Sequence, residues 1–166
     1  MTATDTKAPL PESAQRVADH LRTLGYEKNI VMLPATGKTS AEAAAGLGCS
    51  VAEIAKSIIF RRAEDDVPVL VIASGTNRVD EAKVSAHVGA LAKADAKFVR
   101  EKTGYAIGGV CPVGHAVKPV MLLDQDLFQY DSLWAAAGHP HAVFNLTPAE
   151  LEAMTGAPVA DIAQRD

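Results

Sequence analysis

Two neighbouring runs of β-forming residues, SIIFRR at 57–62 and VPVLVIAS at 67–74, constrain the fold of this chain more than any other feature. Only the turn-like segment AEDD at 63–66 separates them. Valine, isoleucine and phenylalanine favour a pleated, half-buried surface, and a short polar connection joins two strands in antiparallel orientation. The two runs therefore predict an antiparallel hairpin.

The residues before this hairpin carry helix signals. After a polar leader of about nine residues, apolar side chains recur at helical spacing from Ala14 to Leu24 and stop at Gly25, which predicts an amphipathic helix. TSAE at 39–42 and SVAE at 50–53 are two capping-box patterns, and each predicts the start of a short alanine-rich helix. Lys56 is then expected where the second of these helices passes into a strand.

The remaining segments mix helix and strand signals without a regular alternation. The expected elements are strands at 26–33, 97–100, 117–123 and 142–146, helices at 80–88, 126–136 and from 147 onward, and a glycine-rich loop at 103–115. Such an order is typical of an α+β domain rather than a doubly wound fold. We expect a mixed, mostly antiparallel, curved sheet or barrel surrounded by helices. Neither a repeat nor a linker is visible, so residues 1–166 are expected to form a single domain with a short flexible leader.

Composition excludes several classes of function. The chain has 16 basic and 20 acidic residues. This balance does not indicate general binding to polyanions, so any contact with nucleic acid must be local. Cys49 and Cys111 are far apart and form neither a disulfide framework nor a CxxC pair, which fits a reducing cytoplasmic setting. No apolar run has the length of a signal peptide core or a membrane span. We therefore expect a cytoplasmic protein without a membrane partner.

Lys56 is the first candidate for a functional residue, because it lies within the apolar passage IAKSIIF at 54–60. A lysine there can extend its stem along apolar surface and place its charge at a helix end. It can also stand at the rim of a cavity and bind a phosphate or polarise a carbonyl. The sequence leaves both interpretations open. The nearby Gly37-Lys38-Thr39 is not a P-loop, because that motif needs a glycine where this chain has Met32.

The segment GGVCPVGH at 108–115 is the second candidate. Gly108 and Gly109 allow close approach of the backbone to a ligand, so their N–H groups can serve as an oxyanion hole, although a tight surface turn explains the same residues. Cys111 lacks a recognisable base for a nucleophilic role. The spacing of the residues that might bind zinc matches no common structural site; they are Cys111, His115, His139 and His141. We expect no metal.

Several segments together resemble the YbaK/prolyl-tRNA-synthetase-associated editing-domain family, whose members are aminoacyl-tRNA deacylases that act in trans. The similarity runs from about Thr39 to Ile162. It is carried by LGCSVAEIAKSIIF at 47–60, GYAIGGVCPVGH at 104–115, LLDQDL at 122–127 and LTPAELEAMTGAPVADIA at 146–163. A lysine and a Gly-x-x-x-Pro loop thus occur together with flanks like those of the family.

The resemblance implies a pocket for the 3′-terminal aminoacyl-adenosine of a mischarged tRNA, hydrolysis without a metal or cofactor, and attack by a positioned water or a substrate group. Lys56 would hold the terminal phosphate or ester region, while Gly108 and Gly109 would grip the aminoacyl carbonyl. Further substrate-binding residues would be Thr39, Ser57, Cys111, Pro112, Gly114 and His115. The segment Met32-Leu33 would add to the pocket wall.

The resemblance leaves the amino acid open among small residues, with proline tRNA as the most familiar carrier. A synthetase such as prolyl-tRNA synthetase is a possible partner, and a noncatalytic aminoacyl- or adenosine-binding module of the same fold is the alternative function. A short basic rim could contact the acceptor end; its candidates are Lys38, Lys56, Arg61, Arg62, Arg78, Lys83, Lys97, Arg100, Lys102 and Lys118.

Overall fold

The computed structural model describes residues 9–34 and 39–165. Within these ranges eight strands form one sheet in the order β1-β7-β6-β2-β3-β5-β8, and β4 pairs with β2 off this path. Four strand pairs are antiparallel (β1–β7, β2–β3, β2–β4 and β6–β7), and three are parallel (β2–β6, β3–β5 and β5–β8). The strands are β1 Val31–Met32, β2 Ile54–Arg62, β3 Pro68–Ser74, β4 Leu91–Ala92, β5 Val120–Asp124, β6 Leu133–Ala136, β7 Ala142–Leu146 and β8 Val159–Ala160. The mixed, mostly antiparallel α+β architecture is confirmed.

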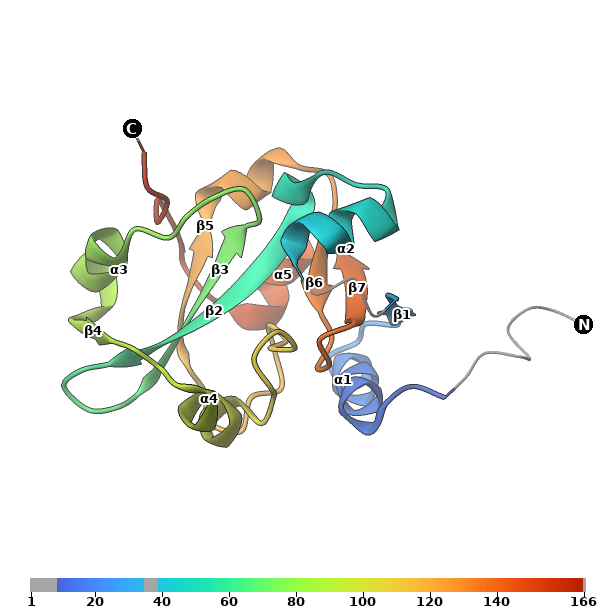
Figure 1. The fold of residues 1–166 in the computed structure, drawn as a ribbon, viewed down its shortest axis with the longest axis horizontal. Coiled ribbons are helices and arrows are strands. Elements are labelled where there is room, and N and C mark those ends of the chain that lie inside the picture. The colour runs from blue at the N-terminus through green and yellow to red at the C-terminus, as the bar shows by residue number, and fades with distance from the viewer. Residues whose placement is uncertain (1–8, 35–38, 166) are drawn as a thin grey trace, which may run out of the picture.

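The predicted hairpin is the longest strand pair within the described residues, and in Figure 1 it runs from the middle of the molecule to a turn at the left. β3 is buried along its whole length. β2 begins at Ile54, three residues earlier than expected, because Ile54 and Ala55 pair with β6. The capping box of Ser50 therefore opens only a short 3₁₀ helix, η2 Val51–Glu53. Lys56 consequently lies inside the strand rather than at its junction with a helix.

Five α-helices cover the sheet within the described residues: α1 Glu12–Thr23, α2 Ser40–Leu47, α3 Glu81–Val88, α4 Ala96–Thr103 and α5 Pro148–Thr155. The predictions for α1, α2, α3 and α5 are confirmed. The capping boxes at Thr39 and Thr147 both form, and Asp80 caps α3.

The expected strand at 97–100 is wrong, because this segment belongs to α4. The Asp95 carboxylate accepts a hydrogen bond from the Phe98 backbone N–H at 2.8 Å, which satisfies an amide at the start of the helix. Val99 and Thr103 are buried one helical turn apart. The helix signal was thus present in the sequence as an N-cap aspartate.

The expected helix at 126–136 is also wrong. Only the 3₁₀ helix η3 Gln125–Gln129 forms there, and strand β6 follows it. Leu133 and Ala135 are buried while Trp134 and Ala136 are half-buried, which is the two-residue period of a strand. The strand expected at 26–33 is reduced to Val31–Met32, and that expected at 117–123 begins at Val120.

Successive side chains of β2 and β3 point to opposite faces of the sheet, and each face has its own core. The larger core contains Leu70 and Ile72 and packs against α1 and the glycine-rich loop. The smaller core contains Val71 and Ala73 and packs against Val84 of α3. α2 lies near the beginning of β2 in Figure 1, whereas β4 lies near its end. Each side chain of β2 is therefore assigned to a face by its position in the register.

Candidate active site

β2 has an open stretch on one of its edges. β3 pairs with it continuously on the other edge, from Ala55 to Arg61. On the open side β6 pairs only at its first two residues and β4 only at its last two. In the part of the chain that the structure describes, no strand pairs with residues 56–60 on that side. Backbone N–H and C=O groups of β2 in this stretch are therefore available for hydrogen bonds to a ligand or to water.

A cavity of about 230 Å³ lies against this open stretch. It is lined by Ser57, Ile58, Ile59, Ala94, Val99, Ile107, Gly108 and Val110. The cavity thus brings together the middle of β2, the region of α4 and the first half of the glycine-rich loop. Two predicted site residues, Ser57 and Gly108, meet here.

Among the described residues that line this cavity, Ser57 alone contributes a side-chain hydroxyl. Its partner in the strand register is Ile72, whose side chain belongs to the larger core. The Ser57 Oγ is buried and has no hydrogen-bond partner among the described residues. A buried polar atom without a partner costs free energy, so it marks a position where a ligand group can be bound.

The two glycines of the loop have different tasks. Gly108 has φ of 90°, a backbone conformation that residues with a side chain rarely adopt. Gly109 packs directly on the β6–β7 turn, where an added Cβ would come within 2.9 Å of the His139 backbone. The Gly109 N–H donates to the Ala106 carbonyl at 2.9 Å, so this amide is already used inside the loop. Of the two predicted donors, only the Gly108 amide lacks an acceptor within the described part of the chain.

Lys56 lies on the other face of the sheet from Ser57, because it is the adjacent residue on the strand. It is half-buried beside Ala73. Burial lowers the pKa of the Lys56 ammonium, the nearby Arg78 lowers it further, and Asp124 acts in the opposite direction. No ion pair of Lys56 is present in the described ranges. The site therefore straddles the edge of β2, with a cationic side at Lys56 and a largely apolar cavity on the side of Ser57.

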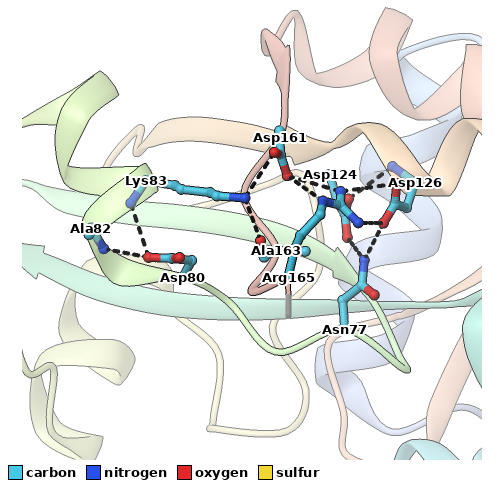
Figure 2. A network of polar contacts seen from close by, with 9 residues as sticks. All are labelled: Asn77, Asp80, Ala82, Lys83, Asp124, Asp126, Asp161, Ala163 and Arg165. Carbon is cyan, nitrogen blue, oxygen red and sulfur yellow. Dashed lines mark hydrogen bonds and ion pairs between the residues drawn. The ribbon is translucent and has the colours of Figure 1, made fainter.

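A buried carboxylate holds the chain that leads from β3 to Arg78. Asp124 has no exposed surface and accepts hydrogen bonds from the Ser74 backbone N–H at 3.0 Å and from the Asn77 amide at 2.7 Å. Asn77 also donates to Asp126 at 2.8 Å, so one amide joins two carboxylates (Figure 2). Sequence reasoning missed this role of Asp124 and Asn77, since LLDQDL was noted only as part of the resemblance.

The C-terminal segment closes the same network. Arg165 binds both Asp126 and Asp161, and Lys83 binds Asp161 at 2.9 Å (Figure 2). The Gln164 backbone N–H donates to the carbonyl of Arg78 at 2.8 Å. The backbone around Arg78 is thereby fixed from two sides, and the side chain of Arg78 remains exposed.

The second half of the loop turns away from Ser57. The Cys111 side chain is fully buried in the larger core, and burial raises the pKa of its thiol to about 12. Pro112, Gly114 and His115 line a separate cavity of about 220 Å³ beside α1 and α5. His115 donates through Nε2 to the Cys111 carbonyl at 2.6 Å, and burial lowers the pKa of its imidazole. These four predicted substrate-binding residues are therefore not brought to the cavity at Ser57.

Thr39 is exposed and its hydroxyl caps α2, so it lines neither of these two cavities. Leu33 is buried against α2, and Met32 is exposed. His139 and His141, considered as zinc ligands from the sequence, are half-buried in the turn that packs on the glycine-rich loop.

Members of the predicted basic rim have different surroundings. Ion pairs with acidic neighbours hold Arg61, Arg62 and Lys83. Lys38 lies outside the described residues, as does Gly37. The rim is therefore not one continuous row of unpaired cations.

Across residues 9–34 and 39–165, no group of three or more histidine, cysteine or acidic side chains is arranged to hold a metal ion. None of the helices described is long and apolar enough to cross a membrane.

Comparison with known families decides the identity of this fold. The model of the aminoacyl-tRNA editing domain matches residues 35–154. The chain belongs to the aminoacyl-tRNA editing domain family. This match spans both sides of the site, from the residues before α2 to the last helix.

Relatives of this editing domain extend over most of the chain. The uncharacterized protein YwhH of Bacillus subtilis is 34% identical over 140 residues, which cover 84% of this chain and 88% of YwhH. A crystal structure described as that of a candidate trans-editing enzyme for prolyl tRNA synthetase is 45% identical, with a TM-score of 0.90, and the match covers 95% of this chain and 100% of that one. The hypothetical protein APE2540 is 30% identical, with a TM-score of 0.82, and the match covers 90% of this chain and 99% of that one. The resemblance seen in the sequence is thus confirmed at the level of the family and the fold.

Proposed function

We propose that this editing domain is a trans-editing deacylase, which hydrolyses the ester between a small amino acid and the 3′ end of a mischarged tRNA. The observation that carries the proposal is the open edge of β2. A half-buried Lys56, which has no ion pair within the described residues, and the cavity at Ser57 and Gly108 lie on two sides of this strand. Proline tRNA is the proposed carrier, because a structure with 45% identity is described as a candidate trans-editing enzyme for prolyl tRNA synthetase.

Lys56 would bind the phosphate of the terminal nucleotide. Its ammonium is partly desolvated beside Arg78, and two neighbouring cations without ion pairs in the described ranges attract an anion. Phosphate binding would in turn raise the pKa of Lys56, since an anion favours the charged form of the amine.

Gly108 would bind the aminoacyl carbonyl through its backbone amide. A water molecule attacks the carbonyl carbon, and negative charge develops on the carbonyl oxygen, where a fixed N–H donor stabilises it. The bond between this carbon and the ribose oxygen then breaks, and the ribose oxygen takes up a proton. The products are the free amino acid and the uncharged tRNA. Gly109 shapes the loop instead of donating, because its amide is bound to Ala106.

The cavity would select the amino acid by size. Its volume of about 230 Å³ and its walls of isoleucine, valine and alanine suit a small side chain and exclude a bulky one. A pocket of this kind acts as a second sieve, which removes small wrong residues that a synthetase cannot reject by binding alone.

Affinity for tRNA is expected to be modest. The net charge is −4, and contacts to phosphates normally dominate binding to nucleic acids. Delivery of the substrate by prolyl-tRNA synthetase would compensate for this, and we propose that synthetase as the partner.

The test is deacylation of proline tRNA carrying Ala, Ser, Cys, Thr or Pro, measured with the wild type, Lys56→Ala and Lys56→Arg. We expect the wild type to release at least one small amino acid, Lys56→Ala to lose at least tenfold in kcat/KM, and Lys56→Arg to retain part of the activity because the cation remains. Lys93→Ala is the matched control, since Lys93 is an exposed lysine that is not itself among the residues lining the cavity.

Two results would contradict the proposal. Wild-type protein that hydrolyses none of the five esters, with and without prolyl-tRNA synthetase, would favour a noncatalytic module that only binds the aminoacyl end. Equal activity of Lys56→Ala and Lys93→Ala would remove Lys56 from the mechanism. Circular dichroism and thermal unfolding of each variant exclude loss of the fold as the cause.

A further inference from the structure

We infer that the hydroxyl of Ser57 selects the amino acid, and that the cavity takes a residue with a hydroxyl on its Cβ, namely serine or threonine. The inference rests on the proposed function, because it assigns the side-chain subsite of the same cavity. It goes beyond a size sieve, since alanine and serine differ little in size but differ in hydrogen bonding.

The position of Ser57 supports this role. Its side chain points to the same face of β2 as that of Ile59, two residues along the strand. Val99 and Val110, which belong to the larger core on this face, form other walls of the cavity. The Ser57 Oγ is buried and unpartnered within the described residues, so a ligand that fills the cavity supplies its nearest polar group.

Among the described residues, the other walls contain no competing polar side chain. Apart from Ser57 and Gly108, every described residue that lines the cavity is alanine, valine or isoleucine. A hydroxyl on the substrate has two possible kinds of partner there, the Ser57 Oγ and the backbone. Lys56 points to the opposite face of the sheet, so it does not reach the same subsite through its side chain.

This arrangement penalises an apolar substrate. A bound alanine excludes water from the cavity and leaves the Ser57 hydroxyl without a partner, whereas a bound serine satisfies it. One satisfied hydrogen bond in such a site corresponds to roughly ten- to hundredfold in kcat/KM. A cysteine thiol is a weak donor and acceptor, so it is expected to lie between alanine and serine.

The experiment compares wild type, Ser57→Ala and Ser57→Thr on proline tRNA charged with Ser, Thr, Ala or Cys. We expect the wild type to prefer Ser or Thr to Ala by at least tenfold in kcat/KM. Ser57→Ala should reduce this preference to less than threefold, because it loses activity on Ser and Thr and gains activity on Ala, which no longer leaves a hydroxyl without a partner. Ser57→Thr keeps the hydroxyl and should keep the preference. Ser85→Ala on α3 is the matched control, because Ser85 does not line the cavity.

A binding measurement separates this inference from the proposed function. Seryl and alanyl analogues of 3′-amino-3′-deoxyadenosine carry an amide in place of the ester and are not hydrolysed, so their dissociation constants do not depend on catalysis. Tighter binding of the seryl analogue by about tenfold, lost in Ser57→Ala, would support selection by the hydroxyl even if no ester were cleaved. Equal binding of both analogues to wild type, or an equal loss for both in Ser57→Ala, would overturn it.

Discussion

Replacement of Asn77 by alanine tests whether the buried carboxylate Asp124 anchors the segment that leads to Arg78. The Asn77 amide donates to Asp124 at 2.7 Å and to Asp126 at 2.8 Å. Asn77→Ala removes both bonds but leaves Asp124 with two backbone donors. It also leaves Asp126 with Arg165. The two carboxylates therefore lose some of their hydrogen bonds and keep the others.

The size of the effect follows from these contacts. A hydrogen bond to a charged group contributes about 1.5–3 kcal/mol when it is well buried. Asp124 is fully buried, whereas the Asp126 side chain is 19% exposed, so water replaces part of the second bond. We expect Asn77→Ala to lower the free energy of unfolding by about 2–4 kcal/mol, and to lower Tm by roughly 5–15 °C in a domain of this length.

Asn77→Asp gives the same experiment a dependence on pH. A third carboxylate beside Asp124 and Asp126 repels both, which raises the pKa of the new side chain. Because of the raised pKa, the loss of folding stability caused by this repulsion is present near neutral pH, where the new side chain is ionised, and disappears as the side chain becomes protonated at lower pH. The deficit of Asn77→Asp relative to wild type should therefore shrink as pH falls from about 7 to about 4.

The assay is urea and thermal unfolding at several pH values, with Thr76→Ala as the control. Thr76 is the exposed neighbour of Asn77, and its replacement should change stability by less than about 0.5 kcal/mol. If Asn77→Ala were as stable as Thr76→Ala, or if Asn77→Asp showed no recovery at low pH, the network would not anchor this segment.

Two other predictions concern the glycine-rich loop. Gly109→Ala should destabilise the protein by about 1–3 kcal/mol and reduce deacylation, because its Cβ would meet the His139 backbone at 2.9 Å and the loop must shift. The control is Gly46→Ala within α2, where the added Cβ makes only an ordinary van der Waals contact; it should stabilise the protein by about 0.5–1 kcal/mol. Equal changes in the free energy of unfolding for both variants would refute the argument. In a thiol-titration assay on native protein near pH 8, Cys49 should react and Cys111 should not, since burial raises the pKa of the Cys111 thiol to about 12 and removes its exposed surface. After unfolding, both thiols should react at similar rates. Fast labelling of Cys111 in the native protein would contradict this prediction and show that the loop opens.

Local signals in the sequence determined the elements whose stability is local. The hairpin of β2 and β3 was recognisable from two β-rich runs and a turn, and the helices that begin at Thr39 and Thr147 from their capping boxes. Each of these depends on contacts between residues close in sequence. The glycine-rich loop and Lys56 of β2 were recognisable for the same reason, because a few neighbouring residues around each of them carried the resemblance to the editing family.

The tertiary structure decided how these pieces form a site. Strands β4 and β6 pair with opposite ends of one edge of β2 and leave its middle open, which depends on segments up to eighty residues away along the chain. The register placed Lys56 and Ser57 on opposite faces, and packing divided the loop between two cavities. Long-range strand pairing also made 133–136 a strand where local residues favoured a helix. Pairing and burial depend on residues distant in sequence. Only the folded chain therefore shows that Ser57, beside the expected lysine, lines the cavity with a buried hydroxyl that has no hydrogen-bond partner among the described residues.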